Sequence, residues 1–569
     1  MSSQDASAAC ESERSIANNR GYQGNENKKE KRRGKRDKFG VSCKQNKSFK
    51  ASCHKTSADH AKSGRGIEAL LPSAIALVVL GFALMAKLGF RGRISVAGID
   101  LGTTNSVICI QALSSSVGKI DCIPDPMNNS PLIPSVVSFL PRTSEGKSNW
   151  KFSTDPFVLV GEIAKQRIDM HSHSTFYHAK RFLGRSFQSV TVQELIQEVE
   201  FKVEQSSISA DDTPLTNDPH ADGVLFYVPT GYNQRDLQQG KQGEKKATSS
   251  IFKHYTSPER IGSYVVRHLL YLAGLHLGYH NIQSAIIAVP AKFDAIQRQA
   301  TVRAFQMAGV KVVRMLEEPA AAALAYGLQH KEGVDYILVY DFGGGTLDVS
   351  ILHVSKGYVE VIASEGDDTL GGADFDSAVA HYLMNKPDVA EHLARVLLAM
   401  ERLSANKEFS VDMEERLAHT CELTKTVPLC QISSLHTIAE KMKIILSSGN
   451  STNEECLALS QSGINDLVET GFSLENFCGA LQPIQMALSI EEFYEATSAL
   501  YERALIPIHA VLKSLDLTQG DIDEVVMVGG TTRMPMIREL VKKALNVQYL
   551  NTHIDPDITV AFGAASVID

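Results

Sequence analysis

The order of apolar and polar positions divides the chain into three parts. Residues 1–66 hold almost no periodic apolar positions, whereas residues 69–86 are apolar and carry no charge. From about residue 94 onward, short β-branched runs alternate with helical stretches, which is typical of an α/β domain. The pattern therefore predicts a disordered tail over 1–66, an apolar segment over 67–90 and one α/β body over 94–569.

Three short apolar runs in the body each end in a glycine-rich turn. Val96–Asp100 precedes LGTTNS, Tyr336–Asp341 precedes FGGGTLD, and Val525–Val528 precedes GGTTRMP. Glycine lets backbone N–H groups approach phosphate oxygens, a threonine hydroxyl can donate to them, and an aspartate at the strand end can hold a hydrated magnesium ion. One such turn is commonplace. Two Asp-x-Gly turns 241 positions apart could grip one polyphosphate from opposite sides, which predicts two related half-domains around a nucleotide.

The segment Ala285–Leu328 predicts a strand, a turn at Pro290, a helix, a strand near Val312 and a second helix that begins at Glu318-Pro319. Proline suits the first turn of a helix, where its missing N–H costs nothing. Glu318 is thereby placed at a strand-to-helix junction, which suits contact with a metal or water. The alternative is an exposed carboxylate that caps the helix.

Together these residues resemble the ATPase domain of the seventy-kilodalton heat-shock chaperones, within the actin and sugar-kinase superfamily. AGIDLGTTNS is similar to the family's first phosphate motif, VYDFGGGTLDVSIL to its second and VVMVGGTTRMP to its adenosine motif. FYHAKRFLGR, Phe176 to Arg185, is similar to the segment with the catalytic lysine. The resemblance implies a duplicated actin-like (ribonuclease-H-like) bilobed fold. Lobe I would cover about 94–285, continued over about 286–335, and lobe II about 336–569.

The resemblance also implies the groups that act on phosphate. Lys180 would position the attacking water and neutralise charge on the transferred phosphoryl, and Thr346 and Asp348 would line the γ-phosphate side. The full catalytic set is Lys180, Glu318, Asp341, Thr346 and Asp348. A hydrated Mg²⁺ would be held by Asp100, Glu318 and Asp341, and K⁺ is a further cation that the site could take.

The same resemblance implies how ATP or ADP would be bound. The loop contacts would come from Gly102, Thr103, Thr104, Asn105, Gly343, Gly344, Gly345, Thr346, Gly529, Gly530 and Thr531. Glu440, Lys443 and Ser447 match the adenosine-binding helix, and their spacing independently places them on one helix face. Arg533 and Asp557 match the remaining contacts. The family's adenine-stacking arginine is replaced by Ile444, so we expect a lower nucleotide affinity.

Charge separates the tail from the body. The net charge is −8, but residues 1–66 hold 16 Lys/Arg against 7 Asp/Glu, and residues 67–569 hold 41 against 58. A basic tail therefore precedes an acidic body, which argues against nucleic acid as a partner of the body. The run from Lys28 to Lys38 is expected to be solvated. A nuclear-localisation or nucleic-acid-binding signal is its alternative.

Nine cysteines without a CxxC pair exclude a disulfide scaffold and give no sign of zinc or thiol redox chemistry. Six cysteines lie in the body, and we interpret them as small buried hydrophobes. They are Cys109, Cys122, Cys421, Cys430, Cys456 and Cys478. The sequence does not decide whether any of them pair.

The apolar segment indicates the compartment. Ala69 to Ala86 has eighteen uncharged residues, nine of them Leu, Ile, Val or Phe, and as a helix would span about 27 Å, close to a hydrocarbon core. A cleavable signal peptide is the closer alternative, but a 66-residue leader is too long for one. A buried core helix fits less well, because the segment is apolar on every side. We predict a transmembrane signal-anchor in the endoplasmic reticulum (microsomal) membrane, with the tail cytosolic and the body lumenal.

The leading hypothesis is a slow, magnesium-dependent ATPase core that serves protein folding through exchange factors, co-chaperones or other chaperones. The family continues into a linker and a peptide-binding domain, whereas this sequence ends at Asp569, so we expect a core without peptide capture, as in a microsomal member of the family. One alternative is a non-catalytic, nucleotide-dependent interaction module or co-chaperone. Another is a sugar kinase on the same scaffold.

Overall fold

A computed structural model of the chain describes residues 79–81, 96–112, 119–140, 157–168, 171–206, 223–229, 255–278, 282–387, 389–395, 421–430, 432–470 and 473–568. The predicted tail over 1–66 lies outside these residues. Of the predicted membrane span, only residues 79–81 are described, as a helical turn. No helix in the described ranges is long and apolar enough to cross a membrane. The signal-anchor therefore stays a prediction.

The first large sheet contains the strand of the first glycine-rich turn. Its order is β12-β11-β1-β2-β3, and β4 pairs with β2. Its strands are β1 (Val96–Asp100), β2 (Asn105–Ala112), β3 (Lys119–Cys122), β4 (Ile133–Pro134), β11 (Ser284–Val289) and β12 (Lys311–Glu317). β1, β11 and β12 run parallel, whereas β2 runs antiparallel to β1. The carboxyl ends of β1, β11 and β12 therefore lie at one edge of the sheet.

The second large sheet repeats this arrangement. Its order is β15-β14-β13-β18, with β13 (Tyr336–Phe342), β14 (Leu347–Ser355), β15 (Tyr358–Asp367) and β18 (Glu524–Val528). β13 is parallel to β18 and antiparallel to β14, as β1 is to β11 and β2. The predicted α/β class and the three predicted strands that precede glycine-rich turns are confirmed.

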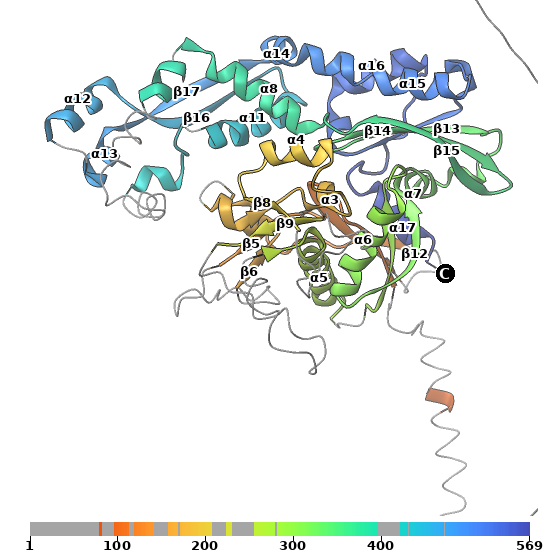
Figure 1. Cartoon of the computed structure of the whole chain (residues 1–569). Helices are drawn as coiled ribbons and strands as arrows, with labels where there is room; N and C mark the ends of the chain where they lie inside the picture. Colours follow the sequence, from red (N-terminus) through yellow and green to blue (C-terminus); the bar gives the residue numbers. More distant parts are fainter. Residues whose placement is uncertain are drawn as a thin grey trace, which may run out of the picture. The chain divides into compact units, whose positions relative to one another are not determined.

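Two helices from distant parts of the sequence pack together beside the sheets: α7 (Glu318–Ala325) and α17 (Thr559–Ser566). Figure 1 shows them side by side. A Cβ on Gly563 would overlap the carbonyl of Ala321, so the close crossing requires glycine. The predicted helix start at Glu318 is confirmed, with Pro319 in the first turn of α7.

The remaining helices cover the sheets and the smaller strands. They are α2 (Glu162–Lys165), α3 (Ala179–Phe182), α4 (Val190–Glu198), α5 (Pro258–Leu277), α6 (Ala295–Met307), α8 (Gly372–Met384), α11 (Ile432–Leu446), α12 (Gln461–Thr470), α13 (Leu474–Ala480), α14 (Ile490–Arg503), α15 (Ile506–Ser514) and α16 (Pro535–Leu545). The smaller sheets contain β5 (Val137–Phe139), β6 (Val158–Val160), β7 (Thr175–Phe176), β8 (Val203–Gln205), β9 (Val224–Tyr227), β10 (Tyr255–Thr256), β16 (Ser451–Leu459) and β17 (Leu481–Ser489). Each large sheet has an apolar core of its own, with Phe176 and Phe182 in one and Tyr340 and Phe375 in the other, and a smaller buried cluster joins residues of both sheets.

The six cysteines of the body, which we interpreted from the sequence as small buried hydrophobes, are paired in the structure. They form three disulfides: Cys109–Cys122, Cys421–Cys478 and Cys430–Cys456. The first joins directly opposed residues of β2 and β3. These cysteines are therefore covalent cross-links and not merely small buried hydrophobes. The partners lie 13, 57 and 26 positions apart, and only the folded chain brings them together.

Candidate functional site

The carboxyl ends of the parallel strands in both large sheets face one cavity of about 1640 Å³. Every site residue predicted from the sequence lines this cavity. They are Asp100, Gly102, Thr103, Thr104, Asn105, Lys180, Glu318, Asp341, Gly343, Gly344, Gly345, Thr346, Asp348, Glu440, Lys443, Ser447, Gly529, Gly530, Thr531, Arg533 and Asp557. Turns at the carboxyl ends of parallel strands are the usual ligand position in α/β folds.

A buried pair of serines holds the turn after β1. The N–H of Gly102 donates to Ser106 Oγ at 3.2 Å, and Ser135 Oγ donates to the carbonyl of Gly102 at 2.8 Å. The two serine hydroxyls lie 2.8 Å apart and are buried. The N–H of Ser135 also donates to the carbonyl of Thr104 at 2.8 Å. Ser135 was not predicted from the sequence, because nothing in its local pattern connects it to a turn more than 30 positions away.

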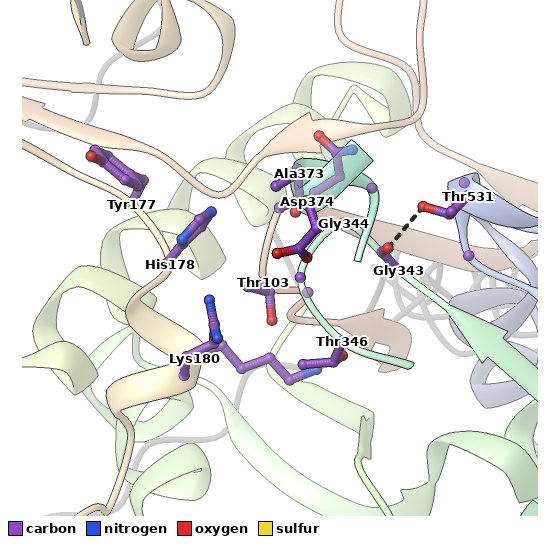
Figure 2. A pocket seen from close by; sticks show the side chains of 18 of the residues that line it. Thr103, Tyr177, His178, Lys180, Gly343, Gly344, Thr346, Ala373, Asp374 and Thr531 are labelled. Atoms are coloured by element: carbon purple, nitrogen blue, oxygen red, sulfur yellow. Dashed lines mark hydrogen bonds between the residues drawn. The ribbon is translucent and has the colours of Figure 1, made fainter. Parts of the chain in front are cut away.

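The turn after β13 is fixed through its carbonyl groups. Gly372 N–H donates to the carbonyl of Gly343 at 3.0 Å, and Ala373 N–H donates to that of Gly344 at 2.8 Å. The hydroxyl of Thr531 donates to the same Gly343 carbonyl at 2.9 Å, which links this turn to the one after β18 (Figure 2). The N–H of Gly344 makes no hydrogen bond within the described residues, so it is a donor that a phosphate oxygen can use.

Glycines allow the three turns to approach one another. A Cβ on Gly344 would overlap Thr104 Oγ1, so the turns after β1 and β13 touch despite their separation in sequence. Gly529 has a φ of 83°, and a Cβ there would overlap the carbonyl of Phe342. A side chain at either glycine would push the turns apart. The predicted meeting of the glycine-rich turns is confirmed by this geometry.

Lys180 lies among the cavity-lining carboxyl groups of Asp100, Glu318, Asp341 and Asp348, and these five side chains form the charged end of the cavity. Its Nζ donates to Glu318 Oε1 at 2.6 Å and lies 3.9 Å from Asp100 Oδ1. Lys180 and Glu318 are 11% and 12% exposed. Burial by itself would lower the pKa of Lys180, but the neighbouring carboxylates of Glu318 and Asp100 raise it overall. Lys180 therefore stays protonated, and Figure 2 shows its side chain extending toward Thr346.

The carboxyl groups at this end are buried, and burial disfavours their charged forms. Burial raises the pKa of Asp100 to about 7, although Lys180 acts to lower it. Burial also raises the pKa of Asp341 well above its usual range, and the nearby charges of Glu318 and Asp348 add to this effect. Burial raises the pKa of Asp348 to about 6, against the charge of Lys292. A bound cation would relieve this concentration of negative charge.

The acidic residues fit a hydrated magnesium ion. Oδ1 of Asp100 is buried and has no hydrogen-bond partner. Within the described ranges, no group of three or more His, Cys, Asp or Glu is arranged to ligate a metal directly. Mg²⁺ usually keeps several of its waters and needs few direct protein ligands. Asp100, Glu318 and Asp341 are therefore suitable acceptors for the waters of such an ion.

One face of α11 forms another part of the cavity lining. Glu440 and Lys443 lie on this helix, and Ser447 follows its last residue and donates its N–H to the Lys443 carbonyl at 3.1 Å. Lys443 Nζ donates to Asp376 of α8 at 2.8 Å. Glu440 accepts a hydrogen bond at 3.3 Å from Lys165 of α2, which also lines the cavity. The predicted single helix face is confirmed, and Lys165 is a contact that sequence analysis missed.

Arg533 and Ile444 also line the cavity. Arg533 Nε donates to Asp557 Oδ2 at 3.0 Å and also pairs with Asp555. Burial raises the pKa of Asp557, although the charge of Arg533 acts to lower it. Ile444 lines the cavity beside Lys443 and is 60% exposed. An apolar side chain therefore stands where the family resemblance led us to expect an arginine.

A sequence model of the Hsp70 protein family matches residues 96–217, 232–409 and 429–568. This chain belongs to the Hsp70 family. It is similar to the chaperone protein DnaK of Prochlorococcus marinus (strain MIT 9515), with 33% identity over 470 residues, or 83% of this chain and 58% of that protein. It is likewise similar to the chaperone protein DnaK of Cyanidium caldarium, with 33% identity over 83% of this chain and 60% of that protein.

The Hsp70 match confirms the family predicted from the sequence. Hsp70 proteins are ATP-binding chaperones, and the matched segments contain every residue predicted for the site. This chain spans about three fifths of the length of the two curated relatives. The mixed α/β architecture is that expected of an Hsp70 ATPase domain.

Proposed function

We propose that the duplicated, actin-like body binds Mg²⁺·ATP in the 1640 Å³ cavity and hydrolyses it slowly to ADP and phosphate, as the ATPase core of a chaperone. The observation that carries this proposal is the convergence of all predicted residues on that cavity, with Lys180 hydrogen-bonded to Glu318 at the charged end. Family membership supports the choice of nucleotide.

The proposed chemistry depends on positioning and charge. Phosphoryl transfer to water needs an in-line nucleophile and stabilisation of the charge on the phosphate oxygens. Lys180 would hold the water and neutralise that charge, while the N–H groups of the glycine-rich turns would orient the phosphates. Bound magnesium would neutralise phosphate charge. Asp348 and Thr346 would close the γ-phosphate side.

Single-turnover hydrolysis of radiolabelled ATP by the purified protein tests the proposal. Lys180→Ala should slow the chemical step by about 100-fold or more, the cost of removing one group that stabilises transition-state charge. Lys202→Ala is the matched control, because Lys202 is an exposed lysine of the same lobe that pairs with Glu204 outside the cavity. Thermal unfolding of each variant separates loss of folding from loss of catalysis. Equal rates for wild type and Lys180→Ala would remove the catalytic assignment.

Ile444 favours a second candidate function. An isoleucine offers adenine no guanidinium stack, a contact worth up to about 2 kcal/mol, so nucleotide exchange could be fast and turnover secondary. The protein would then act as a nucleotide-dependent interaction module toward exchange factors or other chaperones. Measurable ATP binding with no turnover in the single-turnover assay would select this function over the ATPase.

For the cellular location, the proposal is a body on the lumenal side of the endoplasmic reticulum membrane, anchored by the apolar segment 69–86. All six cysteines of the body are paired, and disulfides persist in oxidising compartments and are rare in the cytosol. The basic tail precedes the apolar segment, which favours a cytosolic tail. Protease treatment of sealed microsomes should spare the body until detergent is added. Digestion of the body without detergent would contradict this location.

A further inference from the structure

Seven lysine and arginine side chains line the cavity within the described residues. Five already donate hydrogen bonds to protein acceptors: Lys165, Lys180, Arg181, Lys443 and Arg533. Of the other two, Arg185 lies 3.7 Å from Asp368, a carboxylate that is 51% exposed. Lys292 lies at the charged end, with Nζ 3.9 Å from Asp348 Oδ1 and no hydrogen bond to the described protein. Its ammonium donors are therefore available to a ligand.

The loop that carries Lys292 is held from both sides. Lys292 lies between β11 and α6, in a turn where the N–H of Phe293 donates to the carbonyl of Pro290 at 3.1 Å. Arg298 of α6 donates to the carbonyl of Ala291 at 2.9 Å and to that of Phe293 at 2.8 Å. The Arg298 side chain therefore holds the carbonyl of the residue before Lys292 and the carbonyl of the residue after it. The backbone position of Lys292 is set before any ligand arrives.

The second sheet leaves space for the Lys292 ammonium. Gly366 of β15 is the direct cross-strand neighbour of Asp348 on β14. A Cβ on Gly366 would lie 3.0 Å from Lys292 Nζ and 2.8 Å from Asp348 Oδ1. The absence of a side chain at position 366 therefore lets Lys292 reach from the first sheet across to the second.

We propose that Lys292 is a second phosphate-binding lysine, which contacts the terminal phosphate of a nucleoside triphosphate opposite Lys180. This inference rests on the proposed nucleotide-binding function. Lys180 is already bonded to Glu318, so it is shared between a carboxylate and any phosphate. Lys292 has a looser partner, and a phosphate oxygen is a better acceptor for its ammonium than a carboxylate 3.9 Å away. Lys292 would thereby make the cavity bind a nucleoside triphosphate more tightly than the corresponding diphosphate.

A purely structural role for Lys292 makes a different prediction. If Lys292 only joined the two sheets through Asp348, its loss would weaken binding of every nucleotide alike, because both sheets contribute to the whole cavity. A terminal-phosphate contact is absent from ADP and AMP. The ratio of triphosphate to diphosphate affinity therefore distinguishes the two roles.

The test uses the full chain with Mg²⁺ and titration calorimetry against ADP, AMP and a β,γ-imido analogue of ATP. Lys292→Gln should weaken binding of the analogue about tenfold, a loss of about 1.4 kcal/mol, and leave the ADP and AMP affinities within about twofold. Lys292→Arg should retain most of the preference for the triphosphate, because it keeps the charge. Lys311→Gln, an exposed lysine of β12 outside the cavity, is the matched control and should bind as wild type.

Two results would overturn the inference alone: an unchanged analogue affinity in Lys292→Gln, or an equal loss for the analogue and ADP. Failure of the wild-type protein to bind either nucleotide would instead overturn the proposed function and this inference with it. Lys292→Gln should unfold at the same temperature as the wild-type protein, and this result would show that the variant is folded in the binding measurements.

Discussion

The disulfide Cys430–Cys456 offers a direct test of how the body is stabilised near the cavity. Cys430 lines the cavity, and its N–H donates to the carbonyl of Leu457 at 2.8 Å. The α11 helix, which carries Glu440 and Lys443, begins at Ile432, two residues later. The double substitution Cys430→Ala/Cys456→Ala removes the cross-link and keeps both positions small and apolar.

The expected cost follows from the length of the loop that the bond closes. For a separation of 26 residues, loop-closure entropy gives about 3.5 kcal/mol in free energy of unfolding. Because a body of this size unfolds with an entropy of roughly 1 kcal/mol/K, the melting temperature should fall by roughly 3 to 4 °C. The ADP affinity should also fall, because backbone hydrogen bonds alone would then hold the segment before α11 to β16.

Urea unfolding and calorimetric titration with ADP measure both effects. Cys109→Ala/Cys122→Ala is the matched control: its 13-residue separation predicts a loss of about 3 kcal/mol, but neither cysteine lines the cavity, so ADP binding should not change. Alkylation of the native protein followed by mass spectrometry should find no free thiol at the six positions. Six reactive thiols, or a Cys430→Ala/Cys456→Ala variant as stable as wild type, would refute the reasoning.

Three further predictions concern the same cavity. The folded-state pKa values of Asp100 and Asp348, about 7 and about 6, lie above the ordinary aspartate pKa of 3.8. The folded state therefore binds more protons between about pH 4 and 7, and its stability falls as pH rises through that window. For Asp348 alone the full effect is about 3 kcal/mol, of which about 1.4 kcal/mol falls between pH 5 and pH 8. Urea unfolding at these two pH values without nucleotide should show a smaller difference in Asp348→Asn than in wild type; an equal difference would contradict the assignment. Ser135→Ala should lower stability by about 1–3 kcal/mol and weaken ATP and ADP binding equally, because it releases the turn after β1; unchanged calorimetric affinities would show that the turn does not need this support. Ile444→Arg should tighten ADP binding by up to about 2 kcal/mol, and an affinity equal to wild type would show that the side chain at this position does not reach adenine.

Much of the fold could be predicted because its signals are local. β1 has the predicted bounds, and α7 begins at the predicted Glu318, since strand runs, helix-starting prolines and glycine turns are read from neighbouring residues. The residues that line the cavity were predicted mainly through the family resemblance of the motifs that carry them, and their catalytic and nucleotide-binding roles remain predictions. The lobe boundaries remain predictions.

What the sequence by itself determined is therefore the α/β class, the order of the strand-and-turn motifs, the family and part of the set of residues that line the cavity. Only the tertiary structure decided which cysteines pair, which serine holds the turn after β1, and that Lys292 reaches Asp348 beside a glycine. Each of these contacts joins residues far apart in the chain, and the local pattern of one segment does not say which distant segment it contacts or how two sheets face each other. Their positions follow from the packing of the whole body.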